Sequence, residues 1–247
     1  MTITLQQRQK AWTVLTEAPD QARAAAKTTT TKIEEIRANE NWSDKHKAEQ
    51  IAKLQEDLDR QLATIRKDAD DARDVLAAAA EELAQPQGDT NTQLLHETRT
   101  GRAWARVRPQ LEAGRSHREI LKEAADRRDH ATLTALAAEL PAYLEAARTR
   151  PGGLAGRATQ PLDMAGVRRE IDIATARGLG DDKGFGTAAR LRLHAASAHP
   201  VVHTVVDHVR GGGGNLTTAF RVKYAQQEAE ATTAALAGDG DSGSDAA

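Results

Sequence analysis

Apolar and small side chains recur every seven residues through the first third of the chain, with polar side chains between them. One series is Leu5, Trp12, Pro19, Ala26 and Ile33, and after a polar segment a further series is Ile51, Leu58, Ile65, Ala72 and Ala79. A seven-residue apolar repeat is typical of a coiled coil. Because the polar segment at residues 38–44 is short, it predicts a reversal of the chain. Residues 1–86 are therefore predicted to form an antiparallel coiled-coil hairpin.

The helix boundaries within this hairpin are predicted from capping residues and from Pro19. Proline lacks a backbone donor, so we expect a short helix near residues 3–17 and a second one, capped by Asp20, that continues to about Arg37. An asparagine is expected to leave this helix in a left-handed conformation, and Ser43 is the expected N-cap of the helix that follows.

Alanine fills many of the repeat positions, so two helices alone would bury little apolar area. A second copy of the chain could supply the missing contacts, and we therefore predict a homo-oligomer. A single partner helix is expected to leave Leu62 and Leu76 partly exposed. Whether the hairpin closes within one chain or between two chains stays open. The self-association candidates are Leu54, Leu58, Leu62, Ile65 and Leu76.

Helical spacing resumes after a Pro- and Gly-containing break, with Thr90 and Gln93 as an expected capping box. Pro109 and Pro141 are expected to interrupt or kink the helices that contain them. Valines recur by four from position 201 to 209, which predicts a helix with Pro200 at its first position. The predicted fold class is all-α. The predicted divisions are a small helical domain with a basic face at 90–149, a linker at 150–160, C-terminal helical segments at 161–236 and a disordered acidic tail at 237–247.

Composition narrows the function classes further. The chain has 247 residues, 34 Lys+Arg, 36 Asp+Glu and no Cys, which excludes disulfides and thiolate metal sites. Leu, Ile, Val and Phe together make up about 17% of the chain, which favours thin helical packing over one thick core. No apolar run approaches the ~20 residues that cross a bilayer, and the first ten residues lack the order of a secretory signal. We expect a cytoplasmic protein without a membrane partner.

Histidines are concentrated between positions 194 and 208, where His203 and Asp207 have i, i+4 spacing. The expected helix start at Pro200 separates His199 from His203, so we interpret the stretch as a polar helix face, with metal binding or pH sensing as the alternative. The Gly-rich segment at residues 178–187 lacks the Gly-Lys-Ser/Thr order and the preceding strand of a phosphate-binding loop. We therefore expect no metal, nucleotide or other cofactor, and no enzymatic activity.

A run of arginines offers a candidate binding surface. Arg99, Arg102 and Arg106 recur at i, i+3 and i+7 on a predicted helix that also carries Trp104. Together with Arg118, these residues are the candidates for binding a partner through its phosphates or carboxylates. The other interpretation is a solvated helix face whose charge is neutralised by acidic neighbours.

The repeat region at residues 20–84 and the Gly-Asp-Ser-rich tail, in an Ala-, Arg- and Asp-rich chain without Cys, resemble small helical structural or assembly proteins, of the scaffolding type, from tailed bacteriophages of high-GC bacteria. The resemblance implies an elongated, self-associating protein that binds a phage coat protein through a basic helical segment, here residues 99–128. The predicted function is a non-enzymatic helical assembly or interaction protein. The alternative is a nucleic-acid-binding regulator that docks Arg99, Arg102 and Arg106 on phosphates, although the net charge of −2 argues against it.

Overall fold

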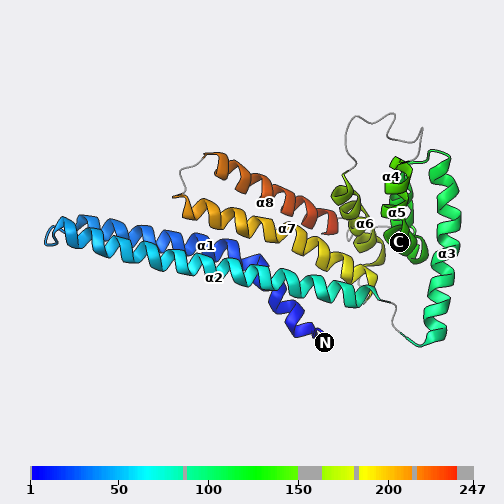
Figure 1. Cartoon of the computed structure of the whole chain (residues 1–247), viewed down its shortest axis with the longest axis horizontal. Coiled ribbons are helices and arrows are strands. Elements are labelled where there is room, and N and C mark those ends of the chain that lie inside the picture. Colours follow the sequence, from blue (N-terminus) through cyan, green and yellow to red (C-terminus); the bar gives the residue numbers. More distant parts are fainter. Residues whose placement is uncertain (1, 86–87, 150–162, 181–183, 213–215, 238–247) are drawn as a thin grey trace, which may run out of the picture. The chain divides into compact units, whose positions relative to one another are not determined.

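The computed structural model describes residues 2–85, 88–149, 163–180, 184–212 and 216–237, and in these ranges it contains helices and no strand (Figure 1). The predicted all-α fold class is therefore confirmed. No helix in the described ranges is both long enough and apolar enough to cross a membrane. The predicted linker at 150–160 and the tail beyond Ala237 lie outside the described residues. The helices are α1 Leu5–Ala38, α2 Asp44–Ala84, α3 Thr90–Glu112, α4 His117–Asp126, α5 His130–Thr149, α6 Met164–Leu179, α7 Phe185–Arg210 and α8 Leu216–Ala237.

The helices form two compact units, and this division differs from the predicted one. Unit 1 consists of residues 1–78 and 194–233, and unit 2 consists of residues 79–193 with the last part of α8 from residue 234. Residues 161–236 were predicted to form a C-terminal division of their own, whereas the structure divides their helices between the two units. Helices α1 and α2 have few large apolar side chains. The buried valines of α7 therefore complete the core of unit 1.

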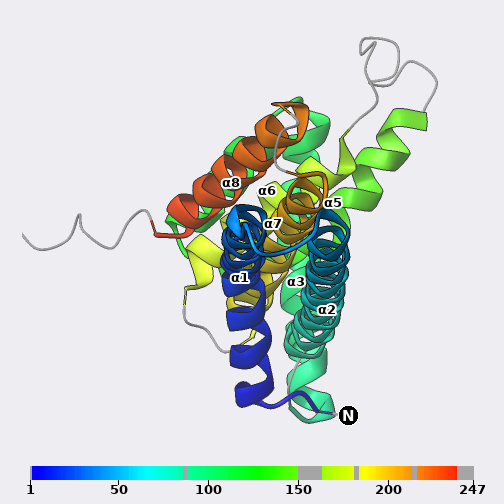
Figure 2. The ribbon, with the colours of Figure 1, turned by 90° about the vertical axis from the view of Figure 1, so that its left-hand side faces the viewer.

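In unit 1, α1 and α2 run in opposite directions beside each other (Figure 1), and Figure 2 shows the same pair side by side from a second direction. Residues 39–43 join them, and the Ser43 hydroxyl accepts a hydrogen bond of 3.3 Å from the backbone N–H of His46, as an N-cap does. The predicted left-handed exit is wrong, because Asn39 ends α1 with φ −74° and ψ 105°. The chain therefore reverses between Ala38 and Asp44, within the polar segment at residues 38–44.

The predicted break at Pro19 is wrong, since α1 continues through this residue from Leu5 to Ala38. Its N-cap is Thr4, which forms a reciprocal capping box with Gln7. Proline removes one backbone hydrogen bond but does not prevent helical dihedrals on both sides, and the ribbon of α1 changes direction along its length (Figure 1). The prolines of α3, α5 and α7 likewise lie inside continuous helices.

Helix α7 lies antiparallel to α2 in unit 1. Its C-terminal Arg210 forms an ion pair of 3.1 Å with Asp59, and one turn earlier Asp207 pairs at 3.1 Å with Arg66. Near residue 194 the same helix reaches α1, where the rings of His194 and Trp12 stack with centroids 3.5 Å apart. The valines of α7 that share this unit are buried at positions 201, 202, 205 and 206.

The expected partial exposure of two self-association candidates is wrong. Leu62 and Leu76 on α2 are both 0% exposed within the single chain. The expected exposure assumed one partner helix for α2, whereas α7 also packs along it. Leu54, Leu58 and Ile65 are half-buried, and they keep the partial exposure that a further contact requires.

Unit 2 has its core between α3, α4, α5 and α6. The leucines of α5 at 133, 136 and 140 are fully buried in this core, together with Val107 of α3 and Ile171 of α6. The predicted capping box at Thr90 is shifted by one residue, because Asp89 is the N-cap and accepts from the backbone N–H of Thr92. Ser116 is the N-cap of α4, where its hydroxyl accepts from the backbone N–H of Arg118.

Candidate functional site

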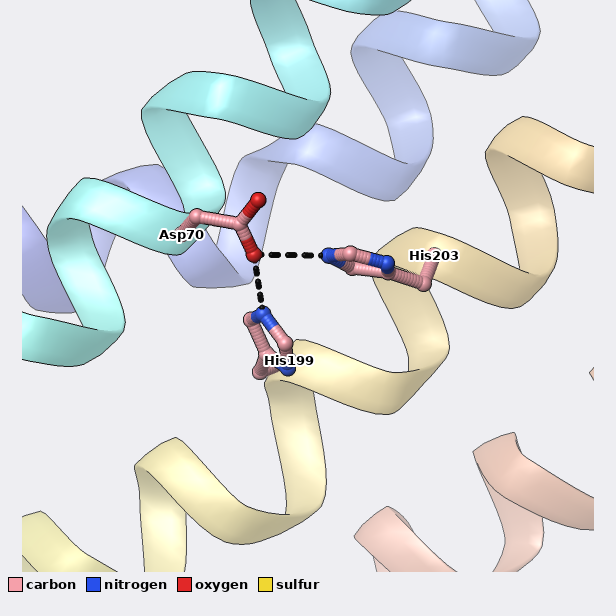
Figure 3. Close-up of side chains that lie close together, drawn as sticks. All are labelled: Asp70, His199 and His203. Carbon is pink, nitrogen blue, oxygen red and sulfur yellow. Dashed lines mark hydrogen bonds and ion pairs between the residues drawn. The ribbon is translucent and has the colours of Figure 1, made fainter.

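The side chains of Asp70, His199 and His203 converge within unit 1 (Figure 3). The Nε2 atoms of His199 and His203 lie 2.6 Å and 2.9 Å from the same oxygen, Oδ1 of Asp70. The two imidazole centroids are 4.3 Å apart, with their planes inclined by 45°. The side chains of His199, His203 and Asp70 are 16%, 23% and 41% exposed, so the histidines are largely buried and the carboxylate stays accessible to solvent.

Regular helix geometry places the two histidines on one face of α7. His199 and His203 are four residues apart, which brings side chains to adjacent turns of a helix. Because α7 continues through Pro200, the expected separation of His199 from His203 does not occur. Asp70 comes from the middle of α2, and the ion pair between Arg66 and Asp207 lies one turn away from it along α2.

Hydrogen bonds from the two histidines and partial burial act in opposite directions on the pKa of the Asp70 carboxyl. An ionised carboxylate only accepts hydrogen bonds, so the Nε2–H groups of His199 and His203 are the donors. The hydrogen bond from His199, followed by that from His203, lowers the pKa of Asp70 below its ordinary value, and partial burial opposes this effect. Asp70 is therefore ionised near neutral pH.

The same three side chains form a group that could hold a metal ion. Each offers one ligand atom, and these atoms all lie within 4.8 Å of one another, which no other set of His, Cys, Asp or Glu achieves in the described ranges. Two imidazoles and one carboxylate are ligands that zinc and other divalent transition metals use in proteins. We expected no metal site, because the expected helix start at Pro200 separated His199 from His203, whereas α7 is continuous through Pro200. Asp207, which has i, i+4 spacing from His203, instead pairs with Arg66. No local signal marks Asp70, which is 129 residues away from His199.

The candidate partner-binding residues lie in unit 2, and they do not form one uniform surface. Arg99 and Arg102 are exposed on α3, and no ion pair to either is found among the described residues. Arg106 is exposed on the same helix. Arg118 on α4 instead pairs with Glu170 of α6 at 2.7 Å. Trp104 is half-buried against the core of unit 2, where its ring meets an aromatic ring of α5 edge to face, so it contributes to packing.

Further basic side chains of this stretch are neutralised within unit 2. Arg108 pairs with Glu112 at 2.9 Å, and Lys122 pairs with Asp126 at 2.7 Å. Glu123 accepts from both Arg115 and Arg127. These pairs agree with the interpretation of a compensated helix face, while Arg99 and Arg102 remain as basic groups that a partner could reach.

A groove of about 1170 Å³ also lies in unit 2. Its lining includes Trp104 and Glu97 of α3, Asp172 of α6, and Arg192 at the unit 2 end of α7. Arg192 donates to Asp172 through Nε at 2.9 Å and through its terminal nitrogen at 2.5 Å. Burial raises the pKa of Asp172 above its ordinary value, although the hydrogen bonds and charge of Arg192 oppose this effect.

The fold and these surfaces define an all-α protein that has an Asp–His–His cluster in one unit and exposed arginines in the other. The chain matches no protein-family model, no curated protein and no solved structure.

Proposed function

We propose that the protein is a helical assembly or interaction protein that self-associates and binds a further protein. The observation that carries this proposal is the exposure of large apolar side chains on two helices. Phe220 and Tyr224 of α8 are each 70% exposed, and Leu94 and Leu95 of α3 are 60% and 57% exposed. Groups of exposed apolar side chains are typical of surfaces that contact other molecules.

The pair on α8 is the stronger of the two surfaces. Phe220 and Tyr224 are four residues apart, so one helix face presents both rings. Aromatic side chains bury about 150–250 Å² each when they are fully covered, and they contribute strongly to interfaces. The chain has only 2 Phe and 2 Tyr, so half of them stand on this face.

Self-association through α1 and α2 is the finer part of the proposal. In this proposal the two helices form the coiled-coil hairpin, and its repeat faces a second copy through Leu54, Leu58 and Ile65. Their partial exposure supports this contact, because it leaves apolar area that a second copy would cover. Leu62 and Leu76 have no part in it, since both are already buried within the chain.

The partner that the bacteriophage resemblance implies is a coat protein, and Arg99 and Arg102 would bind its carboxylates. Both guanidinium groups are exposed, which supports this assignment. The competing assignment, a nucleic-acid-binding regulator, would use the same two arginines on phosphates. Phosphate binding weakens steeply with salt because counterions are released.

Sedimentation velocity of the full chain over micromolar concentrations tests self-association. We expect a sedimentation coefficient that rises with concentration, and a smaller rise for the double variant Phe220→Ser with Tyr224→Ser and for Leu58→Ser. Gln227→Ser is the matched control, because Gln227 is polar and exposed on α8. A monomer at all concentrations would contradict self-association.

DNA binding tests the competing assignment. Salt-dependent binding of duplex DNA that is lost in the double variant Arg99→Ser with Arg102→Ser would favour the nucleic-acid-binding regulator.

A further inference from the structure

We propose that Asp70, His199 and His203 bind one divalent transition-metal ion, which we expect to be zinc, and that this ion links α7 to α2. The three side chains converge from two helices of unit 1, and each aims one donor atom at a common point (Figure 3). This site is independent of the proposed assembly function, which rests on apolar side chains of α2, α3 and α8 outside the cluster.

The spacing of the donors suits a small ion. Zinc binds imidazole nitrogen and carboxylate oxygen at about 2.0–2.2 Å in tetrahedral geometry, which places neighbouring donors about 3.3 Å apart. The two Nε2 atoms lie 2.6 Å and 2.9 Å from Oδ1 of Asp70, so each contact has to lengthen by less than about 1 Å to admit the ion. An adjustment of that size is of the order that side-chain rotation supplies, so α2 and α7 need not move.

The donor types select the class of metal. Calcium and magnesium prefer oxygen ligands, whereas two imidazoles favour zinc and its transition-metal neighbours. Each histidine must present an unprotonated Nε2 to the ion, so a neutral ring carries its proton on Nδ1 instead. That change of tautomer breaks the two hydrogen bonds to Asp70 and replaces them by three bonds to the metal.

Accessibility and burial agree with a bound ion. Asp70 is 41% exposed, so an ion can enter from solvent on the carboxylate side, while the histidines at 16% and 23% are held by packing. Three protein ligands leave one position of a tetrahedral ion, and a water molecule takes it. The ligands are 129 and 133 residues apart in sequence, so the ion binds the folded unit and stabilises it against unfolding.

Isothermal titration of untagged, EDTA-stripped full-length protein with zinc chloride tests the site. We expect one zinc ion per chain, with affinity lowered at least about tenfold in each of His199→Gln, His203→Gln and Asp70→Asn. Glutamine and asparagine keep a polar group at each position, which preserves the fold. The matched control is His208→Gln, which removes an imidazole of α7 outside the cluster and should leave affinity within about twofold.

Two further measurements on the wild-type chain keep the test decisive if a variant fails to fold. Cobalt(II) should give the strong visible absorption of a tetrahedral site, and zinc but not magnesium should raise the melting temperature. No zinc binding, equal binding by the wild type and all three ligand variants, or a loss in His208→Gln as large as in the ligand variants would overturn the proposal. In each of those outcomes the cluster is a hydrogen-bonded contact between α2 and α7.

Discussion

Replacing Leu62 by alanine probes the core that α7 completes in unit 1. Leu62 is 0% exposed on α2, so the substitution removes buried carbons and leaves a cavity. Such changes in packed cores cost about 2–5 kcal/mol, and full burial between packed helices places Leu62 near the middle, at about 3 kcal/mol. Leu58, one turn earlier on the same helix, is half-buried, and the same substitution there should cost about 1 kcal/mol.

Urea unfolding and thermal unfolding, each followed by circular dichroism of the helices, compare the unfolding free energy and the melting temperature of both variants with those of the wild type. Leu62→Ala should lower the melting temperature by roughly 10 °C, since about 1 kcal/mol corresponds to a few degrees in domains of this size. Equal losses at the two positions, or a loss below about 1 kcal/mol at Leu62, would refute the burial of Leu62. That result would instead agree with the partly exposed position expected from the sequence.

Three further predictions concern pH and close packing. Burial lowers the pKa of His194 below 6.5, so folding favours its neutral ring. The stability that this residue contributes is full above pH 6.5 and is lost as the pH falls towards the lowered pKa. His194→Gln should therefore flatten the fall in melting temperature between pH 7.5 and 5. Arg192→Met should destabilise unit 2 by about 2–3 kcal/mol at pH 7 because it leaves the carboxylate of Asp172 unpaired, and the loss should shrink at lower pH or with Asp172→Asn added, as chemical denaturation would show. Gly178→Ala should lower the melting temperature, because a Cβ there would lie 2.8 Å from backbone of α4, whereas Gly101→Ala, with open space around its Cβ, should raise stability by about 0.5–1 kcal/mol.

The helices were predictable from the sequence because their signals are local. The four-residue recurrence of valines indicated a helix at residues 201–209, and Ser43 was recognisable as an N-cap. The breaks expected at Pro19 and Pro200 were wrong, because proline weakens a helix without forbidding it when both sides are held by packing. In α1, Pro19 itself is among the buried residues.

The candidate metal site was predictable only in part. The spacing of His199 and His203 carries the information that they share a helix face, once α7 is continuous through Pro200. Asp70 carries no such information, since it lies in a charged stretch of α2 that the seven-residue repeat places outside the apolar positions. Its partners are known only from the packing of α7 on α2, which is a contact between distant parts of the sequence. The pairing of Arg118 with Glu170 was missed for the same reason.

The alanine content of α1 and α2 explains why unit 1 needs α7. Helices α1 and α2 carry many alanines at their repeat positions, and an alanine buries too little area to offset the entropy of ordering its residue. Unit 1 gains the missing area from the valines of α7, whose ion pairs with Asp59 and Arg66 join segments 151 and 141 residues apart. Closing a loop of such length costs entropy, so these contacts depend on the packing of α7 on α2 and not on local helix formation. A metal ion at Asp70 would bind at this contact between α2 and α7, and it would therefore stabilise the part of unit 1 to which local helix formation contributes least.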